Sequence, residues 1–214
     1  RTRAIGQTQE FDYALPMVGR AQELSAAEAA IERVLAGQGQ IIGITAEAGM
    51  GKTRLSAEII RLAVAHGLAG FGGECESYGT TTPYLVWHNI WRTFFDMDGL
   101  WPTTTIRQLL ERQLAAIDPA LVGRLPLLGT VLNIPLADNE LTAGLDAKAR
   151  KASLESLLVA CVRARAAEQP LMIVLENVHW IDPLSFDLLQ VIARNITDLP
   201  VLLVLLYRPP ELSY

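Results

Sequence analysis

The sequence contains few of the features that mark secreted, metal-stabilised or membrane-spanning proteins. Only two of its 214 residues are cysteine, Cys75 and Cys161, and neither has a neighbouring cysteine or histidine at metal-ligand spacing. We therefore expect neither a disulfide framework nor a metal cluster, and both thiols fit a reducing compartment. Residues 1–10 lack the apolar stretch of a signal peptide, and no apolar run approaches the roughly 18 residues that span a membrane. These absences predict a cytoplasmic location without membrane contact.

A surplus of basic residues is also missing. The chain has 18 Lys and Arg against 23 Asp and Glu, a formal net charge of −5. Domains that bind nucleic acid usually present a strongly basic surface, so we expect no direct nucleic-acid binding by this chain. Half of the residues are apolar, and a chain of this length buries about 70% of its unfolded surface, enough to fold without disulfides or a structural metal. We find no internal repeat and no low-complexity tract.

Four short apolar runs predict buried β-strands: IIGIT (41–45), LAGFGGEC (68–75), LMIVLEN (171–177) and VLLVLLY (201–207). Such continuous hydrophobicity is typical of parallel strands that are covered on both faces. Amphipathic helix patterns flank and separate them, at about 21–36, from 52 to about 65, at 148–168 and at 183–196. This alternation predicts an α/β fold, a three-layer sandwich with a mainly parallel sheet. The periodicity places Leu35, Cys161 and Phe186 among the inward-facing side chains.

The stretch from about 76 to 147 has a different pattern. It contains helix candidates near 84–97 and 104–116, followed by the Pro- and Leu-rich segment GRLPLLGTVLNIPLADNE. We interpret this stretch as a helical insertion between the second and third strands. Its aromatic residues Tyr84, Trp87 and Trp91 recur at helical spacing, which favours core packing over a base-stacking surface.

The connection between the first strand and the next helix carries a phosphate-binding pattern. Residues 46–53 read AEAGMGKT, the P-loop spacing with Ala46 in place of the usual first glycine. Small residues allow successive backbone N–H groups to converge on phosphate oxygens, and the helix N-terminus adds about half a positive charge. Lys52 would contact the β- and γ-phosphates, and the Thr53 hydroxyl would bind Mg²⁺. An ordinary strand–turn–helix connection is the alternative, but the buried strand before and the amphipathic helix after favour a nucleotide site. The predicted binding residues here are Ala46, Glu47, Ala48, Gly49, Met50, Gly51, Lys52, Thr53 and Arg54.

A second group of candidate residues follows the third predicted strand. Glu176 comes after four apolar residues and would hold Mg²⁺ through water. The next residue is Asn177, whose amide can orient a water molecule but cannot accept its proton. Hydrolysis should therefore be slow or depend on another group. His179 is a candidate base, but a structural hydrogen-bonding role is favoured for it. Asp182, directly before Pro183, is expected to cap a helix rather than to catalyse.

Three stretches together resemble a known family. LPMVGR (15–20), GITAEAGMGKTRL (43–55), and LMIVLENVHWIDPLSFDLL (171–189) followed by LPVLLVLLYRPPE (199–211) are similar, in this order, to the AAA-type, STAND-like ATPase domains of large bacterial signalling proteins and transcriptional regulators. The segment 73–92 resembles ATPase modules linked to class III nucleotide cyclase domains or TPR repeats. The chain starts without methionine and reads as a piece of a longer protein, with a linker or tail at 1–12 and the ATPase core at 13–214.

The resemblance assigns further roles. It places Val18, Gly19 and Arg20 near the adenine, and it makes Arg208 the sensor arginine that contacts the γ-phosphate. Asn177 departs from the acidic pair of the family, so we expect a slow enzyme. Its predicted catalytic group consists of Glu176, Asn177, Lys52 and Arg208. The family also continues with another strand, a helical lid and a winged-helix domain, which this sequence lacks.

These inferences together predict an ATP- and Mg²⁺-binding domain that hydrolyses ATP slowly and acts as a regulatory switch. Its expected partners are flanking cyclase, winged-helix or TPR domains of the same chain, with ATP-dependent self-association. Two alternatives stay open: a P-loop kinase that phosphorylates a small molecule in the aromatic insertion, and a nucleotide-binding module that does not hydrolyse ATP.

Overall fold

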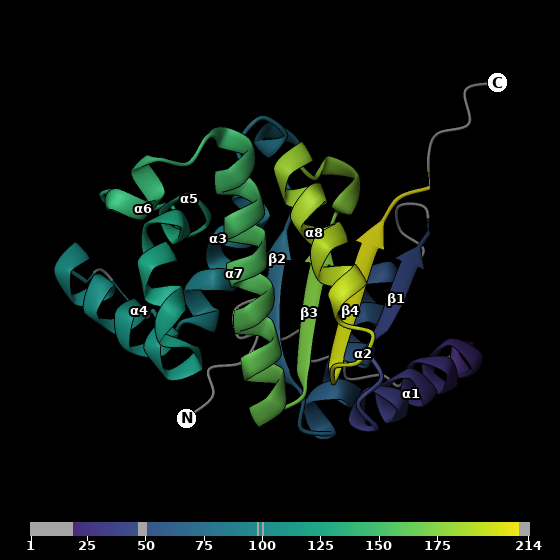
Figure 1. Ribbon diagram of the computed structural model, residues 1–214. Helices are drawn as coiled ribbons and strands as arrows, with labels where there is room; N and C mark the ends of the chain where they lie inside the picture. Colours follow the sequence, from purple (N-terminus) through teal and green to yellow (C-terminus); the bar gives the residue numbers. More distant parts are fainter. Residues whose placement is uncertain (1–18, 47–50, 98, 100, 210–214) are drawn as a thin grey trace.

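Four parallel strands form the centre of the molecule (Figure 1). The computed structural model describes residues 19–46, 51–97, 99 and 101–209. The strands are β1 (Gln40–Thr45), β2 (Ala69–Glu74), β3 (Leu171–Glu176) and β4 (Val201–Tyr207). They lie in the order β1-β4-β3-β2, and every pair is parallel. All four predicted strands are present, and the central strands β3 and β4 are buried as their uninterrupted apolar runs predict. The prediction of burial on both faces is wrong for β1, which lies at one end of the strand order and has Ile41 51% exposed.

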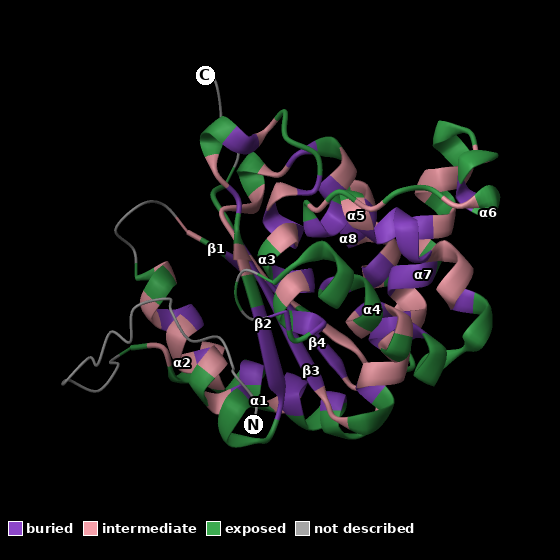
Figure 2. Cartoon of the chain, turned by 90° about the vertical axis from the view of Figure 1, so that its left-hand side faces the viewer, coloured by how far each residue is buried: buried purple, intermediate pink, exposed green. Residues whose placement is uncertain are grey.

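Helices cover both faces of this sheet, which confirms the predicted three-layer sandwich. Side chains alternate along each strand, so Met172 and Val174 face one layer while Ile173 and Leu175 face the other. The first layer consists of α1 (Ala21–Leu35) and α2 (Lys52–Ala65). The second is formed by α3 (Leu85–Phe94), α7 (Ala147–Glu168) and α8 (Pro183–Asn195). In Figure 1, α7 and α8 lie in front of the sheet, and Figure 2 shows that buried residues concentrate on the strands and on the inner helix faces.

The chain between β2 and α7 is helical. After α3 come α4 (Thr103–Ile117), α5 (Leu128–Leu132) and α6 (Glu140–Ala143), with short 3₁₀ helices at Ser77–Gly79, Pro119–Leu127 and, after β3, Val178–Trp180. Tyr84, Trp87 and Trp91 are at most 3% exposed, which confirms the prediction that they pack in the core. Among the described residues, no helix is long and apolar enough to cross a membrane.

Two of the predicted inward-facing side chains are exposed instead. Leu35 is 44% and Phe186 is 45% exposed, whereas Cys161 is fully buried as predicted. Leu35 is the last residue of α1 and follows the buried Val34. In α8 the buried stripe begins at Ser185, which leaves Phe186 rotated by about 100° away from the core.

Asp182 joins the helical segment to α8. Its carboxylate, which is 4% exposed, accepts hydrogen bonds from the backbone N–H of Ser185 (2.9 Å) and of Tyr84 (3.3 Å). The first bond confirms the predicted helix cap. The second bond ties the start of α3 to the start of α8, beside the carboxyl end of β3.

Candidate nucleotide site

The two ends of the phosphate loop are held together by its lysine. Lys52, the first residue of α2, donates a hydrogen bond from Nζ to the backbone oxygen of Ala46 at 2.6 Å. Gly51 precedes it with φ +78°, a left-handed conformation that is costly for any residue with a side chain. Thr53 is exposed in the first turn of α2. The predicted binding residues Val18, Glu47, Ala48, Gly49 and Met50 lie outside the described residues.

The strand order brings distant parts of the sequence to one edge of the sheet. Because β4 lies between β1 and β3, the carboxyl ends of these strands are neighbours, and Thr45 is the register partner of Tyr207. The arrowheads in Figure 1 mark this edge. Ala46, Glu176 and Arg208 follow or end these three strands, so three of the predicted site residues share the edge at which α2 begins.

Two cations at this edge affect the same histidine. Burial first, and then the positive charges of Arg208 and Lys52, lower the pKa of His179. This coupling places both cations within electrostatic reach of the loop after β3. Since Arg208 is exposed, its guanidinium is free of the core and can meet an anion at this edge.

An acid and an amide meet across β2 and β3. Glu74 and Glu176 are register partners at the ends of these strands. The side-chain Nδ2 of Asn177 donates a hydrogen bond to Oε1 of Glu74 at 2.8 Å. Asn177 has φ +53°, which asparagine tolerates better than most residues, and this conformation lets the turn begin immediately after β3. Burial, followed by the negative charge of Glu74, raises the pKa of the Glu176 carboxyl.

Sequence reasoning did not single out Glu74. The second predicted strand visibly ends in an acid, but its position became informative only once the pairing of β2 with β3 was known. The useful signal was Asn177: an amide in place of an acid prompts a search for a carboxylate at the end of a neighbouring strand.

The remaining predicted residues lie at the starts of α1 and α2. Gly19 has φ +80° directly before α1, where Arg20 is the N-cap residue. The Nη1 atom of Arg20 donates to Oε1 of Glu23 at 2.7 Å. Arg54 lies in the first turn of α2 and is half-buried.

A parallel sheet with this strand order and a Gly-Lys-Thr loop between β1 and α2 defines the P-loop NTPase class of fold. The profile of the AAA ATPase domain family matches residues 16–204, so the chain belongs to this family and is a nucleotide-binding domain of the ATPase type. An uncharacterized protein of Rhizobium meliloti (strain 1021) is 34% identical to it over 220 residues, covering 99% of this chain. The chain spans 21% of the length of that relative.

Proposed function

We propose that this domain binds ATP with Mg²⁺ and hydrolyses it slowly, as a switch within a larger signalling or regulatory protein. The observation that carries the proposal is the meeting of Lys52, Arg208 and Glu176 at the edge where α2 begins. Backbone N–H groups at the start of α2 and the Lys52 ammonium would hold the phosphates. Arg208 would pair with the γ-phosphate and so distinguish ATP from ADP.

Thr53 and Glu176 would hold the metal ion. A hydroxyl and a carboxylate provide the hard oxygen ligands that Mg²⁺ prefers. Burial and the neighbouring charge of Glu74 disfavour the unpaired Glu176 carboxylate, as its raised pKa indicates. A bound cation would offset this negative charge, so Glu176 suits a metal ion. When bound, Mg²⁺ would neutralise charge on the phosphate oxygens.

Glu74 is the candidate general base. In the proposed step, the oxygen of a water molecule bonds to the γ-phosphorus and its proton passes to the Glu74 carboxylate. The bond from the γ-phosphorus to its bridging oxygen then breaks, and ADP leaves. Asn177 cannot accept the proton, but its hydrogen bond positions the carboxylate that can. In similar ATPases both acids of the acidic pair follow one strand. Here the second acid, Glu74, would instead lie at the end of β2, and the amide of Asn177 follows β3.

Phosphate release by the intact protein at saturating ATP tests this assignment. We expect Lys52→Ala to lose nucleotide binding, and Glu74→Gln to keep it while turnover falls about 100-fold. The double variant Glu74→Gln/Asn177→Asp returns the acid to the end of β3 beside an amide on β2, and should recover part of the lost rate. Glu76→Gln, with the same charge change two residues further on, is the control and should turn over normally.

Three results would contradict the proposal. Unchanged turnover in Glu74→Gln would remove Glu74 from the mechanism. An intact protein that binds ATP but releases no phosphate would be an inert binding module. Release of ADP only on addition of a small acceptor that becomes phosphorylated would identify a kinase.

The switch role concerns the parts of the protein beyond this domain. Because the chain spans 21% of its relative, we propose that loss of the γ-phosphate is passed from Arg208 to flanking domains, with cyclase, winged-helix or TPR domains as the candidates. Self-association that depends on ATP would be a second output. Size measurements of the intact protein with ATP and with ADP test it, and identical sizes would argue against it.

A further inference from the structure

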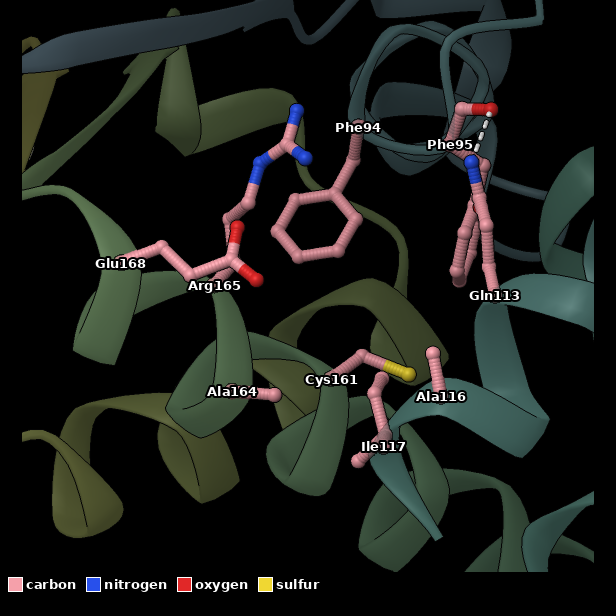
Figure 3. Close-up of a pocket in the computed structure, with 9 residues that line it drawn as sticks. All are labelled: Phe94, Phe95, Gln113, Ala116, Ile117, Cys161, Ala164, Arg165 and Glu168. Atoms are coloured by element: carbon pink, nitrogen blue, oxygen red, sulfur yellow. Dashed lines mark hydrogen bonds between the residues drawn. The ribbon is translucent and has the colours of Figure 1, made fainter. Parts of the chain in front are cut away.

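A hollow lies between α3, α4 and α7 (Figure 3). Its volume of about 300 Å³ is at the lower limit of small-molecule sites. Its lining residues on α7 come from the last two turns of the helix, just before the amino end of β3. The hollow is therefore near the edge of the sheet opposite to Glu176.

The walls of this hollow are divided by polarity. Apolar side chains make up most of the lining, among them Phe94, Phe95, Ile117 and Cys161. Burial raises the pKa of the Cys161 thiol to about 12, so this thiol is an apolar wall rather than a nucleophile. Two charged residues of α7, Arg165 and Glu168, also line the hollow, and in Figure 3 the Arg165 guanidinium extends alongside the Phe94 ring.

Arg165 is oriented by an aromatic ring and only loosely paired with an acid. Its guanidinium lies 5.8 Å from the centre of the Phe94 ring. Its ion pair with Asp96 has an N–O distance of 3.6 Å, longer than the 2.7–2.9 Å of a strong charge-assisted bond. The planar guanidinium thus keeps capacity to bind a carboxylate in the hollow.

The acids near Arg165 favour a ligand that carries an ammonium group as well as a carboxylate. Glu168 lines the hollow and Asp96 contacts Arg165, so two negative charges accompany one positive charge. A simple anion would meet repulsion from Glu168, and a simple amine would leave Arg165 without a new partner. A molecule with both a carboxylate and an ammonium group satisfies both side chains.

We propose that this hollow binds a free amino acid with an apolar side chain. The carboxylate pairs with Arg165, the ammonium group pairs with Glu168, and the side chain packs against Phe94 and Ile117. The volume is roughly twice that of the ~150 Å³ cavity that accommodates benzene, so it has room for phenylalanine or leucine.

The helices around the hollow continue to the nucleotide edge. The chain at the start of α3 is bonded to α8 by the Tyr84 N–H, and the indole Nε1 of Trp87 donates to the backbone oxygen of Ser185 at 3.1 Å. The end of α7 leads directly into β3, which ends at Glu176. A bound amino acid would therefore contact α3, whose start is bonded to α8, and α7, which leads into β3, although its binding does not depend on the ATPase proposal.

Calorimetric titration of the intact protein with matched ligands tests the site without any measurement of turnover. L-Phenylalanine carries both charged groups, 3-phenylpropionate lacks the ammonium group, and 2-phenylethylamine lacks the carboxylate. We expect L-phenylalanine or L-leucine to bind, and both phenylalanine analogues to bind about tenfold more weakly or worse.

Variants of α7 provide the matched controls. Glu168→Gln changes an exposed side chain and should fold normally. It should weaken the binding of L-phenylalanine about tenfold and leave the binding of 3-phenylpropionate no weaker. Arg165→Met should abolish binding of both. Arg163→Met removes an exposed arginine from the same helix, where it pairs with Asp198, and should bind normally.

Several outcomes would overturn the proposal. One is the absence of binding by either amino acid at about 10 mM. Another is equal binding of 3-phenylpropionate and L-phenylalanine, which would indicate an apolar acid as the ligand. Equal binding of N-acetyl-phenylalanine would assign the hollow to the carboxyl terminus of a peptide.

Discussion

At the scale of single residues, the folded protein disfavours the charged form of Glu176. Its raised pKa means that the native state binds the proton of this carboxyl more tightly than the unfolded chain does. The contribution of Glu176 to stability is therefore complete below the unfolded value near 4.5 and is lost as the pH rises through the folded pKa. Above the folded pKa, the charged side chain destabilises the protein.

We therefore predict that Glu176→Gln stabilises the nucleotide-free protein while it removes ATP turnover. The melting temperature at pH 7 should rise by up to a few degrees, and the gain should shrink as the pH approaches 4.5. Glu111→Gln, which removes only a surface ion pair with Arg107, should leave the melting temperature nearly unchanged. Lower stability of Glu176→Gln at pH 7 would contradict this reading of the site.

His179 should report the arrival of phosphate charge. Burial and the positive charges of Arg208 and Lys52 lower its pKa, so a bound triphosphate, which offsets these cations, should raise it. NMR titration of the ring protons with and without a non-hydrolysable ATP analogue measures the change. The pKa of His88, on α3, should stay constant. An unchanged pKa of His179 in the nucleotide complex would place the phosphates away from Lys52 and Arg208.

At the scale of helices and strands, Asp182 acts as a junction rather than as a cap alone. Asp182→Ala removes the helix cap, which costs about 0.5–2 kcal/mol, and leaves the Tyr84 N–H without its acceptor, which costs about 1–3 kcal/mol. We predict a total loss of roughly 2–4 kcal/mol in urea unfolding. Asp146 is an exposed cap of α7 with a single acceptor bond, so Asp146→Ala should cost only about 1 kcal/mol. Equal losses would show that the bond to Tyr84 contributes nothing.

The strands and long helices could be predicted from the sequence because each leaves a local pattern. The run 171–175 is apolar since β3 is covered on both faces, and Asp182 with Pro183 marks the start of α8. Phe186 was misplaced because a small residue, Ser185, occupies the inward position beside Trp87. The pairing of Glu74 with Asn177 could not be predicted, because strand order and register arise from the packing of the whole sheet.

At the scale of the whole molecule, the two edges of the sheet have different chemistry. The carboxyl edge gathers Lys52, Arg208, Glu176 and Glu74, which suits a charged nucleotide. The hollow near the opposite edge has apolar walls and a single pair of opposite charges at one side. The proposed inputs therefore differ in kind, ATP at one edge and an amino acid near the other, with α3 and β3 extending between them.

The central position of β4 has a consequence for how the protein is made. β1 and the phosphate loop are synthesised well before β4, the strand that pairs with β1 in the described part of the chain. At about 5–20 residues per second, this delay is on the order of ten seconds. Throughout that time β1 lacks β4, so the part of the nascent chain that is already made, or a chaperone, must shield β1 until β4 emerges.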